Sequence, residues 1–260
     1  MNIIFFGTPE FGATVLEGLI KGGYKPVLVI TKIASPVKIA AEKYKIKVGD
    51  RISNILKLDS IDLIIVASYG QILPKEILDI PKYGCLNVHP SLLPKYRGPS
   101  PIQAAILNGE KETGVTIMKM DKKMDHGDII SNISYLLSGR ETYETLSKKL
   151  AELGTELLIK IIPDWKNGKI KSNQQDETKA TYTKILKKED GRIDWKKPAE
   201  YIERQVRALN PWPGAYTLYK NKILKLLKVE IINDKLIIKR VQLAGKKPMN
   251  FEDFLRGHKD

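Results

Sequence analysis

The chain has 260 residues, a formal charge of +14, and hydrophobic and charged shares of 42% and 28%, which are typical of a globular protein with one or two domains. Its single cysteine excludes an internal disulfide framework, and no apolar stretch is long enough to span a membrane. The amino terminus has no basic segment before its short apolar run, so we expect no signal peptide and a cytoplasmic protein.

The positive charge is concentrated toward the carboxyl end. Residues 179–260 hold 20 Lys and Arg against 10 Asp and Glu, a net of +10, whereas residues 1–178 carry the remaining +4. A basic carboxyl-terminal third suggests a polyanionic partner, and nucleic acid is the first candidate. The alternative is a lysine-rich solvated surface without such a partner, and the charge alone would favour this alternative over nucleic-acid binding.

Apolar runs and helical spacing alternate through the first part of the chain. Buried strands are indicated by three continuous apolar runs: residues 2–6, 26–31 and 62–67. Helical spacing follows the first two runs, at residues 11–20 and 35–43. This alternation predicts an α/β fold with a Rossmann-like, doubly wound, mostly parallel sheet. The turn at 7–12 lacks the three-glycine dinucleotide fingerprint and carries Glu10, which argues against a nicotinamide cofactor.

An amphipathic helix at residues 142–162 closes the predicted first domain, 1–162. Residues 163–182 contain few apolar side chains and are predicted to be a linker. The second predicted domain, 183–260, is basic and shows a helix and several short strands: residues 199–209, then 217–219, 223–232, 235–241 and the region of Leu243. Asn233-Asp234 is a hairpin signal, and the strands predict a small barrel of the oligonucleotide-binding (OB-like) type.

The stretch that follows residue 84 contains candidate catalytic side chains. Cys85 to His89 is predicted to be a short strand, with Asn87 and His89 on one face, and Pro90 ends it. Two polar side chains are costly to bury on one face of an apolar strand, so they indicate a site at the strand's carboxyl end. The alternative is a hydrogen-bonded core histidine. Cys85 is interpreted as a small apolar filler rather than a nucleophile.

A polar loop, Met118 to Asp128, follows another predicted strand. A carboxylate from this loop would orient the imidazole of His89 and stabilise its charged form. Asn, His and Asp together predict acyl transfer without a nucleophilic side chain. Four residues of this loop, together with His89, have side chains that can bind metals: Asp121, Asp125, His126 and Asp128. Their spacing matches no ligand pattern, so no metal is expected.

Several stretches in one order carry a resemblance to a known family: residues 5–11, 68–74, 87–94, 118–128, 194–195, 202–216 and 242–249. Over nearly its whole length the chain resembles the methionyl-tRNA formyltransferase family. The resemblance implies formyl transfer from 10-formyltetrahydrofolate to the α-amine of methionine on charged initiator tRNA, by a monomer without a metal. It also implies that Asn87, His89 and Asp125 are the catalytic residues.

The resemblance further implies two sets of binding residues. The folate would be bound by Tyr69, Gly70, Gln71, Ile72, Leu73, Ser91, Leu92, Leu93, Pro94, Met120 and Met124. The acceptor would be bound by Thr8, Pro9, Glu10, Phe11, Lys32, Lys38 and Arg97. Phe11 has an equally good interpretation as a core residue of its helix.

The chain departs from the family in two places. The basic insertion usual after the second strand is absent, so that only Lys32 and Lys38 remain there, and the carboxyl-terminal domain is short. An amino-sugar N-formyltransferase therefore stays open as an alternative, as does a nucleic-acid-binding protein with a decayed catalytic domain. A formyltetrahydrofolate hydrolase is disfavoured because nothing resembling a regulatory domain precedes the predicted catalytic part.

Overall fold

A computed structural model describes residues 1–58 and 60–258, which divide into two compact units. The first unit comprises Met1–Pro101, Glu112–Leu136 and Leu146–Thr183. The second comprises Ile102–Lys111, Leu137–Thr145 and Lys184–Asp260. The second unit therefore takes two short segments from the middle of the chain in addition to the carboxyl-terminal part.

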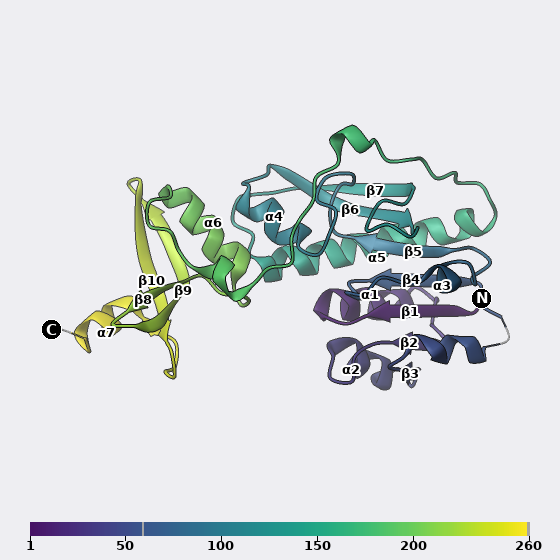
Figure 1. Ribbon diagram of the computed structural model, residues 1–260, viewed down its shortest axis with the longest axis horizontal. Helices are drawn as coiled ribbons and strands as arrows, with labels where there is room; N and C mark the ends of the chain where they lie inside the picture. The colour runs from purple at the N-terminus through teal and green to yellow at the C-terminus, as the bar shows by residue number, and fades with distance from the viewer. Residues whose placement is uncertain (59, 259–260) are drawn as a thin grey trace. The chain divides into compact units, whose positions relative to one another are not determined.

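The first unit is built on a seven-stranded sheet with the order β3-β2-β1-β4-β5-β6-β7, which runs from bottom to top in Figure 1. Its strands are β1 (Ile3–Gly7), β2 (Leu28–Ile30), β3 (Lys47–Gly49), β4 (Leu63–Ala67), β5 (Cys85–His89), β6 (Glu112–Lys119) and β7 (Ile129–Leu136). The strands β1 to β5 pair in parallel, whereas β6 and β7 are antiparallel. The predicted Rossmann-like, mostly parallel sheet is confirmed.

Helices connect these strands: α1 (Glu10–Lys21), α2 (Pro36–Lys43), the short α3 (Lys75–Leu78), α4 (Pro101–Leu107) and α5 (Tyr143–Lys166), with a 3₁₀ turn η1 (Ile52–Lys57). The helix α2 begins after Ser35, whose hydroxyl accepts the Lys38 backbone N–H at 3.1 Å, as an N-cap does. The helix α5 runs four residues past its predicted end at Ile162, through Pro163. Beyond the proline, Asn167 donates its N–H to the Pro163 carbonyl, so the last turn is retained.

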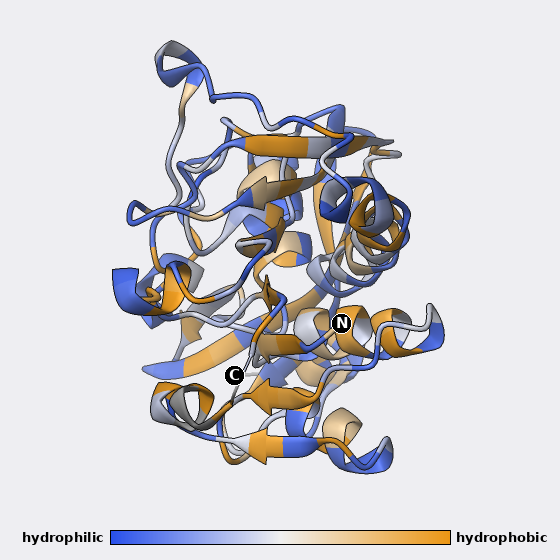
Figure 2. Ribbon diagram, turned by 90° about the vertical axis from the view of Figure 1, so that its right-hand side faces the viewer, coloured by the Kyte–Doolittle hydropathy of each residue, from blue (hydrophilic) through white to orange (hydrophobic). Residues whose placement is uncertain are grey.

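The core of the first unit follows from the apolar strands, which are orange against blue loops in Figure 2. Every residue of β1, β4 and β5 is buried. One cluster joins side chains of several strands, including Ile4, Phe6, Ile64, Val66 and Cys85. Full burial of one such aliphatic or aromatic side chain stabilises the fold by roughly 1.5–3 kcal/mol, so each of these strands contributes substantially to the stability of the unit.

Cys85 lies within this cluster, 1% exposed, and its thiol faces the Ile77 and Leu78 carbonyls. Burial is the main cause that raises the pKa of the Cys85 thiol, to about 12. We therefore expect no alkylation of the folded protein by iodoacetamide at mildly alkaline pH, because the thiolate is the reactive form. Mass spectrometry should find one adduct only after unfolding in guanidinium chloride, and rapid labelling of the folded chain would contradict this placement.

The second unit contains α6 (Ala199–Leu209), a four-stranded antiparallel sheet and α7 (Phe251–Arg256). The strands β8 (Tyr216–Tyr219), β9 (Lys222–Ile232), β10 (Lys235–Leu243) and β11 (Met249–Asn250) are arranged in the order β11-β10-β9-β8. Ile202 and Val206 of α6 pack with Leu226 and Val229 of β9 in its core. The predicted helix at 199–209 is confirmed, whereas the predicted OB-like barrel is not confirmed by this sheet.

The hairpin predicted at Asn233-Asp234 joins β9 to β10. Both residues have positive φ, 50° and 59°, as a type I′ turn requires. Among the residues that the structure describes, no helix is both long and apolar enough to cross a membrane.

Candidate active site

The strand β5 places Asn87 and His89 on one face of the sheet, as predicted from its alternation. Val88 faces the other way, toward Gly154 of α5, where any side chain at Gly154 would collide with it. Asn87 and His89 are only 8% and 4% exposed. Asn87 pairs with Val66 of β4 and Met118 of β6, whereas His89 pairs with Thr116 of β6, and this pairing fixes their backbone.

The Asp125 carboxylate meets both side chains. Its Oδ1 accepts an N–H of the Asn87 amide at 3.2 Å and lies 3.6 Å from Nδ1 of His89. Its Oδ2 accepts the backbone N–H of Gly98 at 2.8 Å. The structure therefore brings together the three residues predicted to be catalytic, from a strand and a loop that are far apart in the sequence.

The loop between β6 and β7 reaches β5 because it folds back on itself. The Met120 N–H donates to the Cys85 carbonyl, and the Lys119 N–H donates to the Asp128 carbonyl, each at 2.8 Å. A Cβ atom at Gly127 would lie 1.9 Å from the Lys119 carbonyl oxygen, so only glycine allows this approach. Asp125 itself has φ +50°, a left-handed conformation that few residues other than glycine adopt.

The ring of His89 is held between two acceptors. Its Nε2 lies 3.0 Å from the Tyr96 carbonyl oxygen, which can only accept, so Nε2 carries a proton. The other ring nitrogen, Nδ1, faces the Asp125 carboxylate. A proton on Nδ1 would be attracted by that negative charge, whereas a lone pair there would be repelled. The Tyr96 carbonyl and the Asp125 carboxylate thus fix the orientation of the ring.

Asn87 retains a donor for a substrate. A side-chain amide carries two N–H groups, and only one of them is bound to Asp125. The other has no partner among residues 1–58 and 60–258. Its position beside the imidazole suits stabilisation of a developing oxyanion.

Two loops hold the residues predicted to bind folate. In the first, Tyr69 and Leu73 are buried at 5% and 2% exposure, and Ile72 between them is 74% exposed. The ring of Tyr69 packs edge-on against Phe6, and burial raises the pKa of its hydroxyl. Gly70 and Gln71 are exposed as well. The middle of this loop is therefore available to a ligand, while its ends anchor it in the core.

The second loop is rigid. Ser91 is fully buried and its hydroxyl donates to the Lys95 carbonyl at 2.7 Å. The Thr116 hydroxyl accepts the Leu93 N–H and donates to the Ser91 carbonyl. Leu93 is buried, and Leu92 and Pro94 are half-buried. These contacts give the stretch a structural role whether or not it also binds folate.

The residues of the β6–β7 loop in the predicted folate set differ in exposure. Met124 is 48% exposed, whereas Met120 packs against the core cluster. Met120 also lines a hollow of about 670 Å³ beside Lys75, Lys119 and Trp165, at the amino end of β5. None of the three predicted catalytic residues lines this hollow.

The residues predicted to bind the acceptor are dispersed. Pro9, Glu10 and Lys32 are exposed, Thr8 is half-buried, and Lys38 is paired with Glu42 at 3.6 Å. Phe11 is 3% exposed, which favours its alternative interpretation as a core residue of α1. Arg97 is fully buried, and its guanidinium is bound to Glu177, Gln175 and Tyr182. Its predicted contact with the acceptor stays a prediction.

Sequence reasoning missed three groups that hold the site: the Tyr96 carbonyl, the Gly98 N–H and the side chain of Gln175. Backbone groups occur at every position, so no sequence signal distinguishes the first two. Gln175 lies in a polar stretch without periodicity. In the part of the chain that the structure describes, no three His, Cys, Asp or Glu side chains converge as a metal site would require, and the expectation that no metal is needed stays a prediction.

Comparisons with known proteins also indicate a formyl transferase. The model of a family described as formyl transferase matches residues 1–162, and that of a formyl transferase carboxyl-terminal domain matches residues 185–236. A methionyl-tRNA formyltransferase of Bacillus velezensis is 42% identical, over 98% of this chain and 94% of the relative. That alignment spans 300 positions, more than this chain has residues, so the relative contains segments that this chain lacks.

Two solved structures share the fold. An N-formyltransferase of Helicobacter canadensis, in complex with folinic acid and dTDP-3-aminofucose, superposes with a TM-score of 0.73 at 22% identity over 94% of this chain and 96% of that one. A methionyl-tRNA formyltransferase from Clostridium thermocellum gives 0.67 at 23% identity over 94% and 98%. At these identities the likeness concerns the fold alone.

Proposed function

The chain belongs to the formyl transferase family, and from that premise we propose that it transfers the formyl group of 10-formyltetrahydrofolate to the α-amino group of methionine on initiator tRNA. The observation that carries the proposal is the meeting of Asn87, His89 and Asp125 at the end of β5. The 42% identity to a methionyl-tRNA formyltransferase along nearly the whole chain supports this acceptor.

In the proposed reaction the unprotonated amine attacks the formyl carbon, and negative charge develops on the formyl oxygen. The free N–H of Asn87 and the positive charge of protonated His89 stabilise that oxyanion, while Asp125 stabilises the imidazolium. As the bond from the formyl carbon to the folate nitrogen breaks, a proton passes from the attacking amine to that nitrogen. His89 and Asp125 relay it.

A flat pterin needs backbone donors and acceptors at its edge and apolar cover on its faces. The exposed middle of the 69–73 loop and the loop that carries Asp125 offer both. Ile72 and Met124 are the large apolar side chains that they expose. The folate complex of the Helicobacter canadensis enzyme supports a folate donor for this fold.

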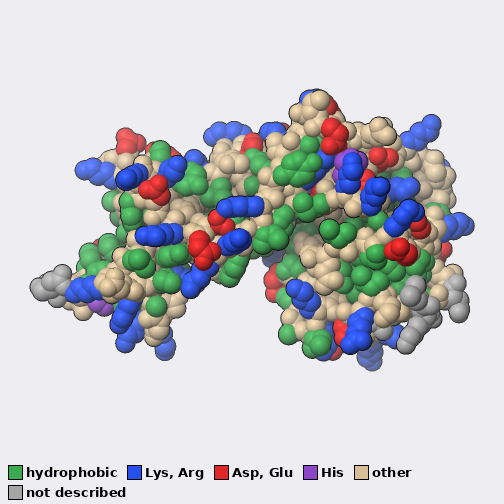
Figure 3. All heavy atoms as spheres, viewed as in Figure 1, with side chains coloured by type: hydrophobic (Ala, Val, Ile, Leu, Met, Phe, Trp, Pro, Cys, Tyr) green, Lys and Arg blue, Asp and Glu red, His purple; other side chains and the backbone are tan. Residues whose placement is uncertain are grey.

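The tRNA would be held mainly by charge. The net +10 of residues 179–260 lies almost entirely in the second unit. On the face shown in Figure 3, Lys and Arg side chains are spread over that unit and interspersed with acidic ones. Distributed lysines suit contacts to phosphates, which give affinity without sequence readout.

The test is formyl transfer by the purified protein to three acceptors side by side: charged initiator methionyl-tRNA, charged elongator methionyl-tRNA and a panel of nucleotide-linked amino sugars. We expect rapid transfer to initiator tRNA. Comparable rates on both tRNAs would retain the enzyme class and assign discrimination to the missing insertion after β2. Turnover of an amino sugar alone would overturn the proposed acceptor.

A further inference from the structure

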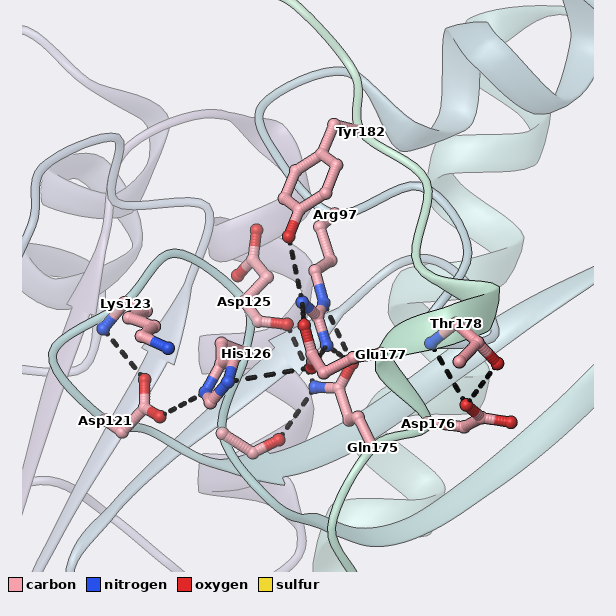
Figure 4. A network of polar contacts seen from close by, with 11 residues as sticks. Arg97, Asp121, Lys123, Asp125, His126, Gln175, Asp176, Glu177, Thr178 and Tyr182 are labelled. Carbon is pink, nitrogen blue, oxygen red and sulfur yellow. Dashed lines mark hydrogen bonds and ion pairs between the residues drawn. The ribbon is translucent and has the colours of Figure 1, made fainter.

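The segment 172–183, here called the strap, follows α5 and runs past both loops that hold the catalytic groups (Figure 4). Near its start, Asn173 exchanges two backbone hydrogen bonds with Ile129, each 2.8 Å long. Near its end, Thr183 donates its N–H to the Arg97 carbonyl at 2.7 Å. A segment predicted as a linker is thus paired on both sides of the site.

Gln175 is the part of the strap that holds the Asp125 loop. Its side chain is 9% exposed, and its Nε2 donates to the carbonyls of Asp125 and Gly127 at 2.9 and 2.7 Å. Its Oε1 accepts from Nε and Nη2 of Arg97 at 3.0 and 2.8 Å. Both amide hydrogens and both oxygen lone pairs are therefore used. The bonds to the loop fix the left-handed backbone of Asp125, which is unfavourable without external support.

Thr181 is the part of the strap that holds the partner of His89. Tyr96, whose carbonyl accepts Nε2 of His89, also has a positive φ, +59°. The Tyr96 N–H donates to the Thr181 hydroxyl at 2.8 Å, and the Arg97 N–H donates to the Thr181 carbonyl at 2.8 Å. The strap therefore clamps both strained residues that position the catalytic groups.

Arg97 connects the part of the strap around Gln175 with the part around Thr181. It is fully buried, and its guanidinium forms a fork with the Glu177 carboxylate, at 2.5 and 3.0 Å. The hydrogen bonds with Glu177 raise the pKa of Arg97 and lower that of Glu177. A buried cation without such a partner would be strongly destabilising. Glu177 therefore allows the Arg97 cation to remain buried. The Glu177 carboxylate also lies 3.6 Å from Nε2 of His126, in the loop that carries Asp125.

We propose that the strap is a positioning device for formyl transfer: Gln175, together with the buried Arg97, fixes the Asp125 carboxylate, and Thr181 fixes the Tyr96 carbonyl that orients His89. The inference rests on the proposed function, because it assigns Asp125 and His89 to the reaction. Arg97 then acts through Gln175 as a positioning residue rather than as a contact to the acceptor.

The test is Gln175→Glu, which keeps the acceptor for Arg97 and loses the N–H donors to the two carbonyls. We expect kcat to fall at least about tenfold, since small misplacements of reacting groups are costly, while KM for either substrate changes less than about threefold. Asp176→Asn is the matched control, because among the described residues the Asp176 carboxylate binds partners within the strap alone, Thr178 and Lys179. It should leave kcat unchanged.

A double-mutant cycle separates positioning from general destabilisation. If Gln175 acts through Asp125, Gln175→Glu should cost less than about threefold in an Asp125→Asn background, because coupled residues are not additive. Equal losses in both backgrounds, or a single variant with wild-type kcat, would overturn the proposal. Thr181→Val, with Thr178→Val as its control, is tested in the same way against a His89→Ala background, and it leaves Gln175 and the buried Arg97 in place.

An independent measurement does not need the reaction. The Gly98 amide donates to Asp125, so its hydrogen exchange reports whether that carboxylate is held. We expect exchange at Gly98 to quicken at least about tenfold in Gln175→Glu and to stay unchanged in Asp176→Asn. If the wild-type protein formylates no acceptor, the proposed function fails, and unchanged exchange at Gly98 would separately overturn the role of the strap.

Discussion

We expect His89→Ala and Asn87→Ala each to lower kcat for formyl transfer by about two to three orders of magnitude. Each change removes a group that would stabilise the developing oxyanion, either the Asn87 amide donor or the His89 charge, and this interaction is made in the transition state and not with bound substrate. KM should therefore change much less than kcat. The rate is measured with purified variants at saturating folate and charged initiator tRNA.

The fold should survive both changes. His89 and Asn87 lie at the end of a strand whose backbone pairs on both sides, and their loss leaves the β5 ladder intact. Removal of a buried hydrogen-bonding partner costs about 1–3 kcal/mol of stability, which lowers the melting temperature without unfolding the chain. Asn132→Ala, at an exposed position of β7 in the same sheet, is the control and should keep full activity. Near wild-type turnover in either site variant would contradict the assignment.

Those parts of the fold that depend on local signals could be predicted from the sequence. The helix α6 has the predicted limits, and β5 spans Cys85–His89 as expected because Pro90 stops the ladder. The turn is also found at the predicted residues Asn233-Asp234, because Asn and Asp tolerate the positive φ that it needs. The alternation of Asn87 and His89 with Val88 follows from the strand period alone.

Features that depend on distant partners were not predictable. The end of α5 is one case, because the helix continues past Pro163, where a proline predicts a stop, and Trp165 beyond it donates to the distant Tyr83 carbonyl. Arg97 is another: the resemblance implies that it binds the acceptor, whereas in the structure Gln175 and Glu177, about 80 residues later in the chain, bind its guanidinium in the interior. The proximity of the strap to Arg97 is a property of the tertiary structure, and no local sequence signal indicates it.

Asp125 allows a sharper experiment than its two partners, because its backbone and its charge can be tested separately. We expect Asp125→Asn to retain the fold, since asparagine tolerates left-handed φ as aspartate does and its side-chain oxygen can still accept the Gly98 N–H. The negative charge that stabilises the imidazolium is lost. A decrease in kcat of about two to four orders of magnitude follows if proton relay depends on that charge.

Two further variants show which property matters. Asp125→Ala loses both the charge and the residue type suited to φ +50°, so its melting temperature should fall below that of Asp125→Asn while kcat falls at least as far. Asp234→Asn makes the same chemical change at another left-handed aspartate, φ +59°, in the β9–β10 turn, and should leave kcat unchanged. If Asp125→Asn kept more than about a tenth of wild-type kcat, Asp125 would act through its backbone and its hydrogen bonds, and the charge on the imidazolium would need no counterion for catalysis.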